Sequence, residues 1–191
     1  MTRPARLQKL SVEDYIAGED GAECRHEYID GQVYAMTGAS RAHGLILGNL
    51  HAMLHARARG GRCQLFINDM KVRLRICGQD IFYYPDLLLT CDPNDRETYY
   101  CTAPCLLIEV LSESTERIDR REKLLAYQSI PSLEAYWLVA QDKRCLEVYR
   151  RRDQWHPEII TSGNLTLDCL EGELSLDAIY EDVMSEARAA D

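Results

Sequence analysis

Long apolar runs are missing from this 191-residue sequence. None approaches the roughly 20 consecutive apolar residues that a membrane-spanning helix needs, so we expect no membrane segment. The amino terminus, Met1 to Arg6, carries charge and no apolar region follows it, which predicts that a secretory signal is absent. Linkers, internal repeats and low-complexity segments are also lacking. These absences predict one globular domain over residues 1–191, located in the cytoplasm.

The sequence also lacks a surplus of positive charge. Its 22 Lys and Arg residues are outnumbered by 31 Asp and Glu residues, for a formal net charge of −9. This balance argues against a general polyanion-binding surface, because non-specific affinity for nucleic acid comes from cations that displace counterions. No DNA-reading module and no glycine loop that cradles phosphate is recognisable. The arginines are nevertheless clustered, in residues 57–62, 117–123 and 143–152. Each cluster is either a solvent-exposed charged face or part of the lining of a cleft.

Closely spaced cysteines are scarce, although the sequence has 8 cysteines. Their scatter, without a secretory signal, favours free thiols in a reducing compartment. Cys101 and Cys105 are close in sequence, but no second close pair completes a zinc site. His51 and His55 are four residues apart on a predicted helix, a spacing that can hold a metal, but a third ligand is not evident.

The hydrophobic pattern alternates between strand and helix periods. A short helix is expected from Ser11 to Gly18, and Asp30-Gly31 between two strand-like runs predicts a hairpin, because both turn residues must accept positive φ. Apolar residues three and four apart predict a helix from Ser40 to Arg59. The remaining predictions are strands over 64–76, 81–90, 106–111, 135–140 and 145–149, a helix over 114–129, a polar extension with one strand pair, and a tail helix ending at 191. This order predicts an α/β or α+β fold around a mixed sheet.

Two acidic residues stand within or beside strand-like apolar runs. Glu109 interrupts the run from Leu106 to Leu111, and Asp86 follows Pro85 at the mouth of the preceding run. Neighbouring strands are about 5 Å apart, so both carboxylates can converge on one cation. A buried, unpaired carboxylate costs several kcal/mol and therefore needs a partner. For Glu109 that partner is either a divalent metal shared with Asp86 or an arginine or lysine.

The predicted helix after Glu109 brings a lysine within range. Lys123 shares a helical face with Asp119 and Tyr127, while Leu124, Leu125 and Ile130 can serve the core. A helix that packs back on the sheet can aim Lys123 at the two carboxylates. Two acids and a lysine beside magnesium (Mg2+) or manganese (Mn2+) make a site for phosphodiester hydrolysis.

The sequence resembles the Uma2-type (DUF820) family of the PD-(D/E)XK superfamily of restriction-endonuclease-like nucleases. The resemblance covers roughly residues 11–180 and rests on "HEYIDGQVYAMTGAS" followed by His43, "YPDLLL", "PCLLIEVLSESTERIDRREKLLAYQSI", "LEAYWLV", and "VYRR" before Trp155. It implies a restriction-endonuclease-like αβββαβ core with a mixed sheet flanked by helices and an N-terminal hairpin. It also implies a metal-dependent nuclease as the ancestral activity, with Asp86 and Glu109 as metal ligands.

The resemblance assigns further residues and includes one departure. The superfamily pattern has lysine two residues after the glutamate, where this sequence has Leu111. Lys123 from the following helix is the expected substitute. Glu27 matches an acidic position of the family and is a candidate metal or water contact. His43 and Asp119 are candidate accessory residues. The alternative for His43 is a structural role in a capped helix, and the alternative for Asp119 is a surface ion pair.

Three hypotheses about function follow. The first is a metal-dependent DNA endonuclease that works as a homodimer, so that two sites face two strands. The second is a nuclease fold that has become a binding or assembly module for mobile-element or defence proteins. The third is a metal-dependent hydrolase of another phosphate compound. The first two are distinguished by whether Asp86, Glu109 and Lys123 converge.

Overall fold

The computed structural model describes residues 9–36 and 38–183, in which strands outnumber helices. The helices are α1 (Val12–Glu19), α2 (Arg41–Ala58), α3 (Glu116–Ile118), the π-helical turn η1 (Asp119–Lys123), α4 (Leu124–Gln128), the 3-10 turn η2 (Arg151–Asp153) and α5 (Leu176–Ile179). The strands are β1 (His26–Ile29), β2 (Gln32–Ala35), β3 (Gln64–Ile67), β4 (Lys71–Ile76), β5 (Gln79–Tyr83), β6 (Leu87–Thr90), β7 (Tyr100–Cys101), β8 (Pro104–Val110), β9 (Ala135–Val139), β10 (Leu146–Arg150), β11 (Pro157–Ile160), β12 (Asn164–Thr166) and β13 (Glu173–Ser175).

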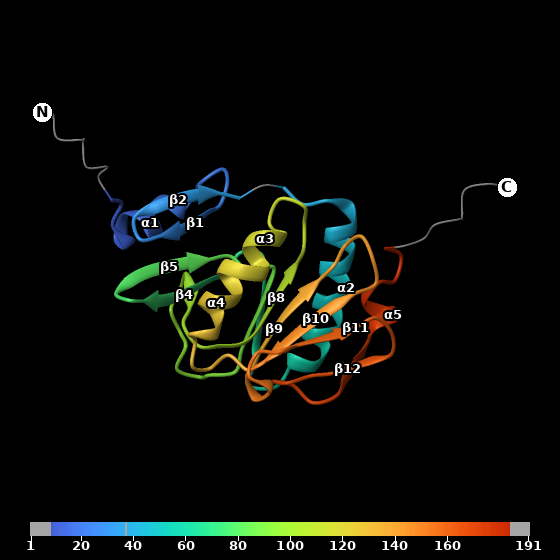
Figure 1. Cartoon of the computed structure of the whole chain (residues 1–191). Helices are drawn as coiled ribbons and strands as arrows, with labels where there is room; N and C mark the ends of the chain where they lie inside the picture. Colours follow the sequence, from blue (N-terminus) through green and yellow to red (C-terminus); the bar gives the residue numbers. More distant parts are fainter. Residues whose placement is uncertain (1–8, 37, 184–191) are drawn as a thin grey trace, which may run out of the picture.

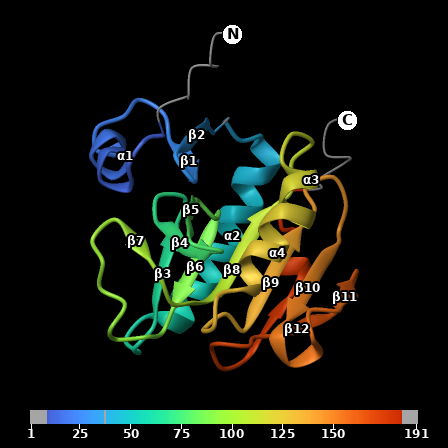
Figure 2. The same cartoon turned by 60° about the vertical axis from the view of Figure 1, so that its left-hand side comes forward.

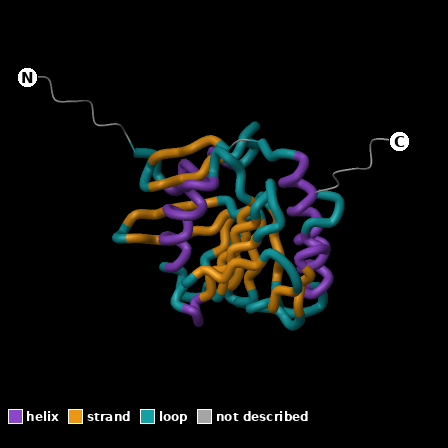
Figure 3. Tube along the Cα trace, turned by 45° about the vertical axis from the view of Figure 1, so that its right-hand side comes forward, coloured by secondary structure: helices purple, strands orange, loops and turns teal. Residues whose placement is uncertain are grey.

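The central layer is a six-stranded sheet of order β11-β10-β9-β8-β6-β3. Strands β8 and β9 are parallel, and the other described neighbours in this sheet are antiparallel, so the predicted mixed sheet is confirmed. One face packs on α2 and α5, and the other on α4 together with β4 and β5. Figure 3 shows this layering, with the strands between two groups of helices.

A second sheet, of order β2-β1-β5-β4-β7, contains the N-terminal hairpin. The predicted turn is confirmed: Asp30 and Gly31 have φ values of 46° and 93°, and β1 pairs with β2. Helix α1 begins after Ser11, whose side chain accepts a hydrogen bond from the backbone N–H of Asp14. Figures 1 and 2 place the hairpin near the end of the molecule where β8 runs into α3. That end contains the candidate site.

Helix α2 agrees with the prediction from sequence. Ser40 caps it by accepting a hydrogen bond from the backbone N–H of His43. Its apolar stripe is fully buried at Ile46, Leu50 and Leu54, as the spacing of three and four residues requires. The rings of His51 and His55 stack with centroids 5.4 Å apart. Among the described residues, neither belongs to a cluster that could hold a metal ion.

Two predicted strands are wrong, because each is two strands in different sheets. The run over 64–76 breaks after β3 at Asn68, which has a φ of 58°. The run over 81–90 breaks at Tyr84-Pro85-Asp86, between β5 and β6. Proline cannot donate to a strand ladder, and the chain crosses from one sheet to the other at this point. The apolar pattern resumes after each break because each sheet buries its own part.

The helix predicted over 114–129 is confirmed in extent but not in regularity. It consists of α3, the π-helical turn η1 and α4. The expectation that Leu125 serves the core is wrong, because this residue is 70% exposed. Its neighbours Ala126 and Tyr127 are buried instead. The π-helical turn rotates α4 relative to the face that an uninterrupted α-helix would present.

The C-terminal part contains one strand that sequence patterns missed. Strand β11, which begins at Pro157, pairs with β10 at the edge of the six-stranded sheet. The predicted strand pair is present as β12 and β13. The predicted tail helix corresponds to α5 in its first part, and residues 184–191 lie outside the described residues. Helices long and apolar enough to cross a membrane are absent from the described chain.

The expectation of free thiols is wrong for two cysteines. Cys63 and Cys91 form a disulfide between the strand ends of β3 and β6. The first strand pair places Gln64 opposite Thr90, so the two cysteines lie at the next cross-strand position. Cysteines 28 residues apart become neighbours through this pairing, which spacing in the sequence does not reveal.

Candidate active site

Glu109 is the buried carboxylate at the centre of the candidate site. Strand β8 alternates faces, so that Ile108 and Val110 contact the α2 layer while Glu109 points with Leu107 toward α4. The residue is 4% exposed. Its Oε1 atom accepts hydrogen bonds from Lys123 Nζ at 3.0 Å and from the Tyr127 hydroxyl at 3.2 Å. Glu109 therefore has the cationic partner that its burial requires.

Lys123 is bound by three carboxylates. Its Nζ lies 3.0 Å from Oε1 of Glu109, 3.0 Å from Oε1 of Glu27 and 3.4 Å from Oδ1 of Asp119. The side chain is 6% exposed, and the ammonium also lies 5.5 Å from the centroid of the Tyr83 ring. Asp119 begins and Lys123 ends the π-helical turn, so both side chains are buried on the face toward the sheet. Of the two carboxylates that the sequence analysis placed within reach of Lys123, Glu109 is in contact with it.

Asp86 joins the site through different contacts. It directly precedes β6, which pairs with β8, and its Oδ2 accepts a hydrogen bond of 2.7 Å from the backbone N–H of Val110. Its Oδ1 lies 3.2 Å from Nε2 of His43 at the start of α2. The carboxylate is therefore fixed next to Glu109 by the backbone of β8. It contacts His43 and not Lys123 among the described ion pairs.

Glu27 reaches the site from the second sheet. Glu27 lies in β1. Its Oε1 contacts Lys123 Nζ and accepts a hydrogen bond of 3.4 Å from the backbone N–H of Tyr84. Tyr84 precedes Pro85 and Asp86 in the crossover between the sheets. The sequence-predicted residues thus come from β1, α2, the β5–β6 crossover, β8 and η1.

Excess negative charge dominates the electrostatics of the site. Burial raises the pKa of Glu109 well above its usual value; Lys123 opposes this shift, while Asp119, Asp86 and Glu27 add to it. Burial alone would lower the pKa of Lys123, but Glu109, Glu27 and Asp119 raise it well above the usual lysine value. Lys123 is therefore a permanent cation facing more carboxylates than it can neutralise.

His43 also carries a shifted pKa. Burial acts to lower it, but the hydrogen bond and the charge of Asp86, together with the backbone of Val110, raise it above the usual histidine value. Protonation of His43 is thereby favoured beside Asp86. The backbone N–H of His43 donates to the Ser40 cap of α2, so His43 has a structural place in the capped helix in addition to its contact with Asp86.

The donor set can accept a hard divalent cation. Within the described residues, both hydrogen bonds to Glu109 end on Oε1, and its Oε2 has no donor and is not fully buried. Asp86 supplies a second carboxylate on the neighbouring strand. Among residues 9–36 and 38–183, no three His, Cys, Asp or Glu side chains form a ready metal cage. Magnesium is commonly held by one or two carboxylates, with water or phosphate oxygens completing its shell, so two suffice.

Two tyrosines near the site were missed as functional candidates. Tyr136 donates a hydrogen bond to the backbone oxygen of Asp119 at 3.2 Å, and Tyr83 faces the Lys123 ammonium. Burial raises the pKa of Tyr83 to about 12, so its ring remains neutral. Both residues lie in apolar runs, where an aromatic side chain is indistinguishable from ordinary core. Tyr127 was placed correctly on the face of Lys123.

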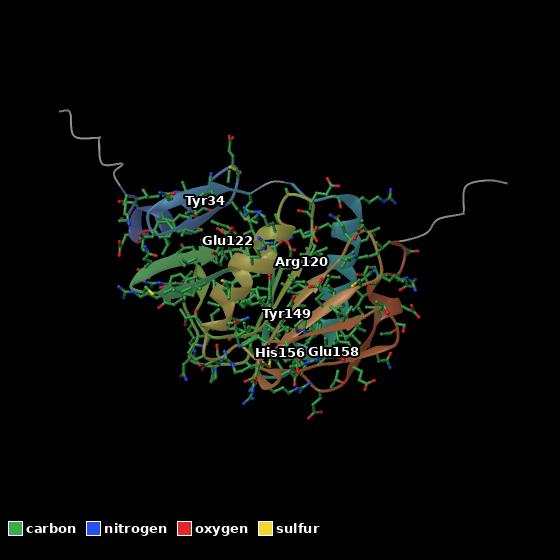
Figure 4. The ribbon with its side chains drawn as sticks, in the orientation of Figure 1. Tyr34, Arg120, Glu122, Tyr149, His156 and Glu158 are labelled. Carbon is green, nitrogen blue, oxygen red and sulfur yellow. A yellow bond between two sulfur atoms is a disulfide. The ribbon has the colours of Figure 1, made fainter. Side chains whose placement is uncertain are left out.

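The arginines beside the site differ in how closely acidic residues pair with them. Arg120 donates to Glu147 at 2.7 Å and to Glu116 at 3.2 Å. Figure 4 shows Arg120 near the short helices and Tyr149 on the strands below it; Tyr149 donates to the same Glu147 side chain. Arg117 is mostly exposed and lies 3.9 Å from Glu122. Arg120 is therefore neutralised by two glutamates, whereas Arg117 keeps an exposed charge at this border of the site.

Comparison with known proteins identifies relatives over most of the chain. An uncharacterized protein of Synechocystis sp., slr1290, is 36% identical over 180 residues, which are 92% of this chain and 94% of that protein. A second, sll1609, is 30% identical over 150 residues, covering 77% of this chain and 84% of that protein. The family model for Uma2, described as "putative restriction endonuclease", matches residues 12–178.

A solved structure shares the fold. The crystal structure of a "putative nuclease belonging to DUF820" from Anabaena variabilis matches with a TM-score of 0.68 at 17% sequence identity. The match covers 85% of this chain and 93% of that chain. The predicted fold class is confirmed by this similarity. The family match over residues 12–178 and the 36% identity to slr1290 show that the chain belongs to the Uma2 (DUF820) family.

Proposed function

We propose that this chain is a magnesium- or manganese-dependent endonuclease that hydrolyses phosphodiester bonds in DNA. Membership of the Uma2 family supports a nuclease. The observation that carries the proposal is the contact of 3.0 Å between Lys123 Nζ and Oε1 of Glu109. Position 111, where the superfamily pattern has a lysine, is a leucine in this chain, and Lys123 brings an ammonium to Glu109 instead.

Asp86 and Glu109 would hold the metal ion. Each carboxylate is oriented by a fixed donor: the Val110 N–H for Asp86, and Lys123 with Tyr127 for Glu109. A divalent ion at these oxygens lowers the pKa of a bound water and polarises a phosphoryl oxygen. Donors that fix the carboxylates in advance reduce the cost of reorganisation when metal binds.

Lys123 would contribute charge stabilisation. Its ammonium has three donors and is permanently protonated in this environment, so it can orient a water or hydrogen-bond a phosphate oxygen that gains negative charge in the transition state. Glu27 and Asp119 hold the ammonium at fixed distances. Glu27 is positioned to contact an attacking water, and His43 orients Asp86.

The charge of the chain limits how it would bind DNA. With a net charge of −9 and Arg120 paired to two glutamates, affinity from surface cations is low. The metal ion and Lys123 would therefore provide much of the local attraction for phosphate. A homodimer would present one site to each of the two DNA strands. We expect weak, strongly metal-dependent binding rather than tight non-specific binding.

Cleavage of supercoiled plasmid tests the proposal. The purified protein is incubated with plasmid in magnesium, in manganese and in EDTA, beside single-stranded DNA and RNA substrates. Nicked or linear plasmid with either metal, and none in EDTA, is expected. Binding of plasmid without cleavage at millimolar metal would favour a nuclease fold that serves as a binding or assembly module, for example with mobile-element or defence proteins. Cleavage of RNA alone would contradict the assignment of DNA.

A further inference from the structure

A cluster of sulfur atoms lies at the far end of the strands that carry Asp86 and Glu109. The Cys63–Cys91 disulfide joins β3 and β6, and Cys105 in β8 places its Sγ 3.6 Å from Cys91 Sγ. This distance is van der Waals contact between sulfurs. All three cysteines border the same apolar core, and none of them is fully exposed.

A β-bulge directs Cys105 to the disulfide. Strand pairing places Leu89 opposite Leu106 but Thr90 opposite Pro104, so Cys105 is the extra residue on β8. A bulge re-aims a side chain and interrupts the ladder at that point. The Cys105 carbonyl is held on the other side by the backbone N–H of Glu134 at 2.9 Å. The approach of Cys105 to Cys91 is thus built into the backbone of the sheet.

We propose that Cys63, Cys91 and Cys105 form a thiol–disulfide exchange centre in which Cys91 is the shared sulfur. Cys105 gives its proton to solvent and its sulfur bonds to Cys91, while the bond between Cys91 and Cys63 breaks. Cys63 leaves as a thiolate and takes up a proton. One disulfide and one thiol exist before and after the step, so the exchange needs no external oxidant or reductant.

Neighbouring groups support both the attacking and the leaving sulfur. The neighbouring Cys105 thiol, and then burial, raise the pKa of Cys169, which keeps Cys169 a thiol beside Cys105. Cys63 lines a cavity of about 320 Å³ together with His55 and Arg59. A cationic side chain such as that of Arg59 stabilises a thiolate, and the cavity gives the released Cys63 access to solvent.

The two disulfide arrangements tie different strands. The Cys63–Cys91 bond fastens edge strand β3 to β6, whereas a Cys91–Cys105 bond fastens β6 to β8 and releases Cys63. The centre lies at the opposite end of β6 and β8 from Asp86 and Glu109. The exchange proposal therefore does not rest on the proposed nuclease activity.

Peptide mapping after an acid quench and alkylation of free thiols tests the exchange in the full chain. Wild-type protein equilibrated at about pH 8, near the usual cysteine pKa, should contain both Cys63–Cys91 and Cys91–Cys105 peptides. Cys63→Ser treated with oxidised glutathione should form the Cys91–Cys105 disulfide without accumulating glutathione on Cys91. Cys63→Ser with Cys105→Ser should retain glutathione on Cys91. Cys24→Ser, which removes an exposed thiol outside the cluster, should match wild type.

The proposal requires both disulfide-linked peptides in wild-type protein and formation of the Cys91–Cys105 disulfide in Cys63→Ser. It is overturned if wild-type protein contains the Cys63–Cys91 link alone, or if Cys63→Ser keeps glutathione on Cys91 or pairs Cys91 with Cys169. Stoichiometric zinc held by the reduced cysteines, and lost in Cys105→Ser, would also overturn it, because the sulfurs would then be metal ligands. Circular dichroism of each variant shows whether it is folded.

Discussion

Lys123 lies 3.0 Å from Glu109 although the two residues are 14 positions apart in the sequence. A lysine two positions after the glutamate would point to the same face of the same strand; here the cation comes from the π-helical turn that follows β8. The same ammonium contacts Glu27 from the second sheet. Lys123 therefore links the two sheets at the candidate site, and its replacement should affect both stability and activity.

Replacing Lys123 by methionine should destabilise the fold. Methionine keeps the length of the side chain but leaves Glu109, Glu27 and Asp119 without their cation, and breaking a buried ion pair costs about 3 kcal/mol or more. The loss should shrink as pH falls, because the unpaired carboxylates then take up protons. Urea unfolding at two pH values measures both effects. The exposed Lys143 provides the control: Lys143→Met should change the free energy of unfolding little. An equally small change in Lys123→Met would contradict the ionic network.

The Tyr127 hydroxyl is expected to stabilise Glu109 without contacting substrate. Tyr127→Phe removes the hydrogen bond of 3.2 Å to Oε1, and a bond to a charged acceptor is worth about 2 kcal/mol. Because outer partners orient metal ligands, manganese affinity should also fall about tenfold or more. Chemical unfolding and metal titration measure the two quantities. Tyr34→Phe, which removes an exposed hydroxyl, is the matched control. Identical metal affinity in both variants would show that Tyr127 does not position Glu109.

The contact between His43 and Asp86 should make stability depend on pH. The folded-state pKa of His43 is raised by Asp86 despite burial, so its contribution is fully present below about 6.5, the pKa in the unfolded chain. That contribution is lost as pH rises through the higher folded-state pKa. In metal-free buffer with EDTA, wild-type protein should lose unfolding free energy across this window, relative to His43→Gln. The variant of the exposed His156, His156→Gln, should follow wild type. Parallel curves for wild type and His43→Gln would refute the contact.

The Cys63–Cys91 disulfide should contribute measurably to stability. It closes a loop with a sequence separation of 28, for which loop entropy gives about 3.5 kcal/mol. A non-thiol reductant should therefore lower the urea midpoint of wild-type protein and leave Cys63→Ser with Cys91→Ser unchanged. Wild-type unfolding that is insensitive to the reductant would indicate that the bond is absent in solution.

Local chemistry made part of the fold predictable. Asp30 and Gly31 accept positive φ and Ser40 supplies a helix cap, so the hairpin and α2 could be located from sequence. Glu109 was recognisable because a carboxylate within a doubly covered strand needs a partner. The proximity of Lys123 to Glu109 was also expected, since the helix that follows a buried strand packs back on the sheet.

The remaining features depend on tertiary context. The breaks at Asn68 and Pro85 fall at polar or proline positions, but the sequence does not show that the apolar stretches on either side join different sheets. The π-helical turn has no marker in its sequence, so the exposure of Leu125 could not be predicted. The Cys63–Cys91 pairing follows from strand register, which a single sequence does not give.

Parallel measurements of manganese binding and plasmid cleavage in two variants test the central claim most directly. Glu109→Gln removes a proposed metal ligand and should lose both manganese binding and cleavage. Lys123→Met keeps both proposed ligands but loses one donor that orients Glu109, so it should still bind manganese at saturating metal while cleavage falls to background. Glu147→Gln, outside the proposed ligand set, should retain both. Full cleavage by Lys123→Met, or unchanged manganese binding by Glu109→Gln, would contradict the proposed roles of these residues.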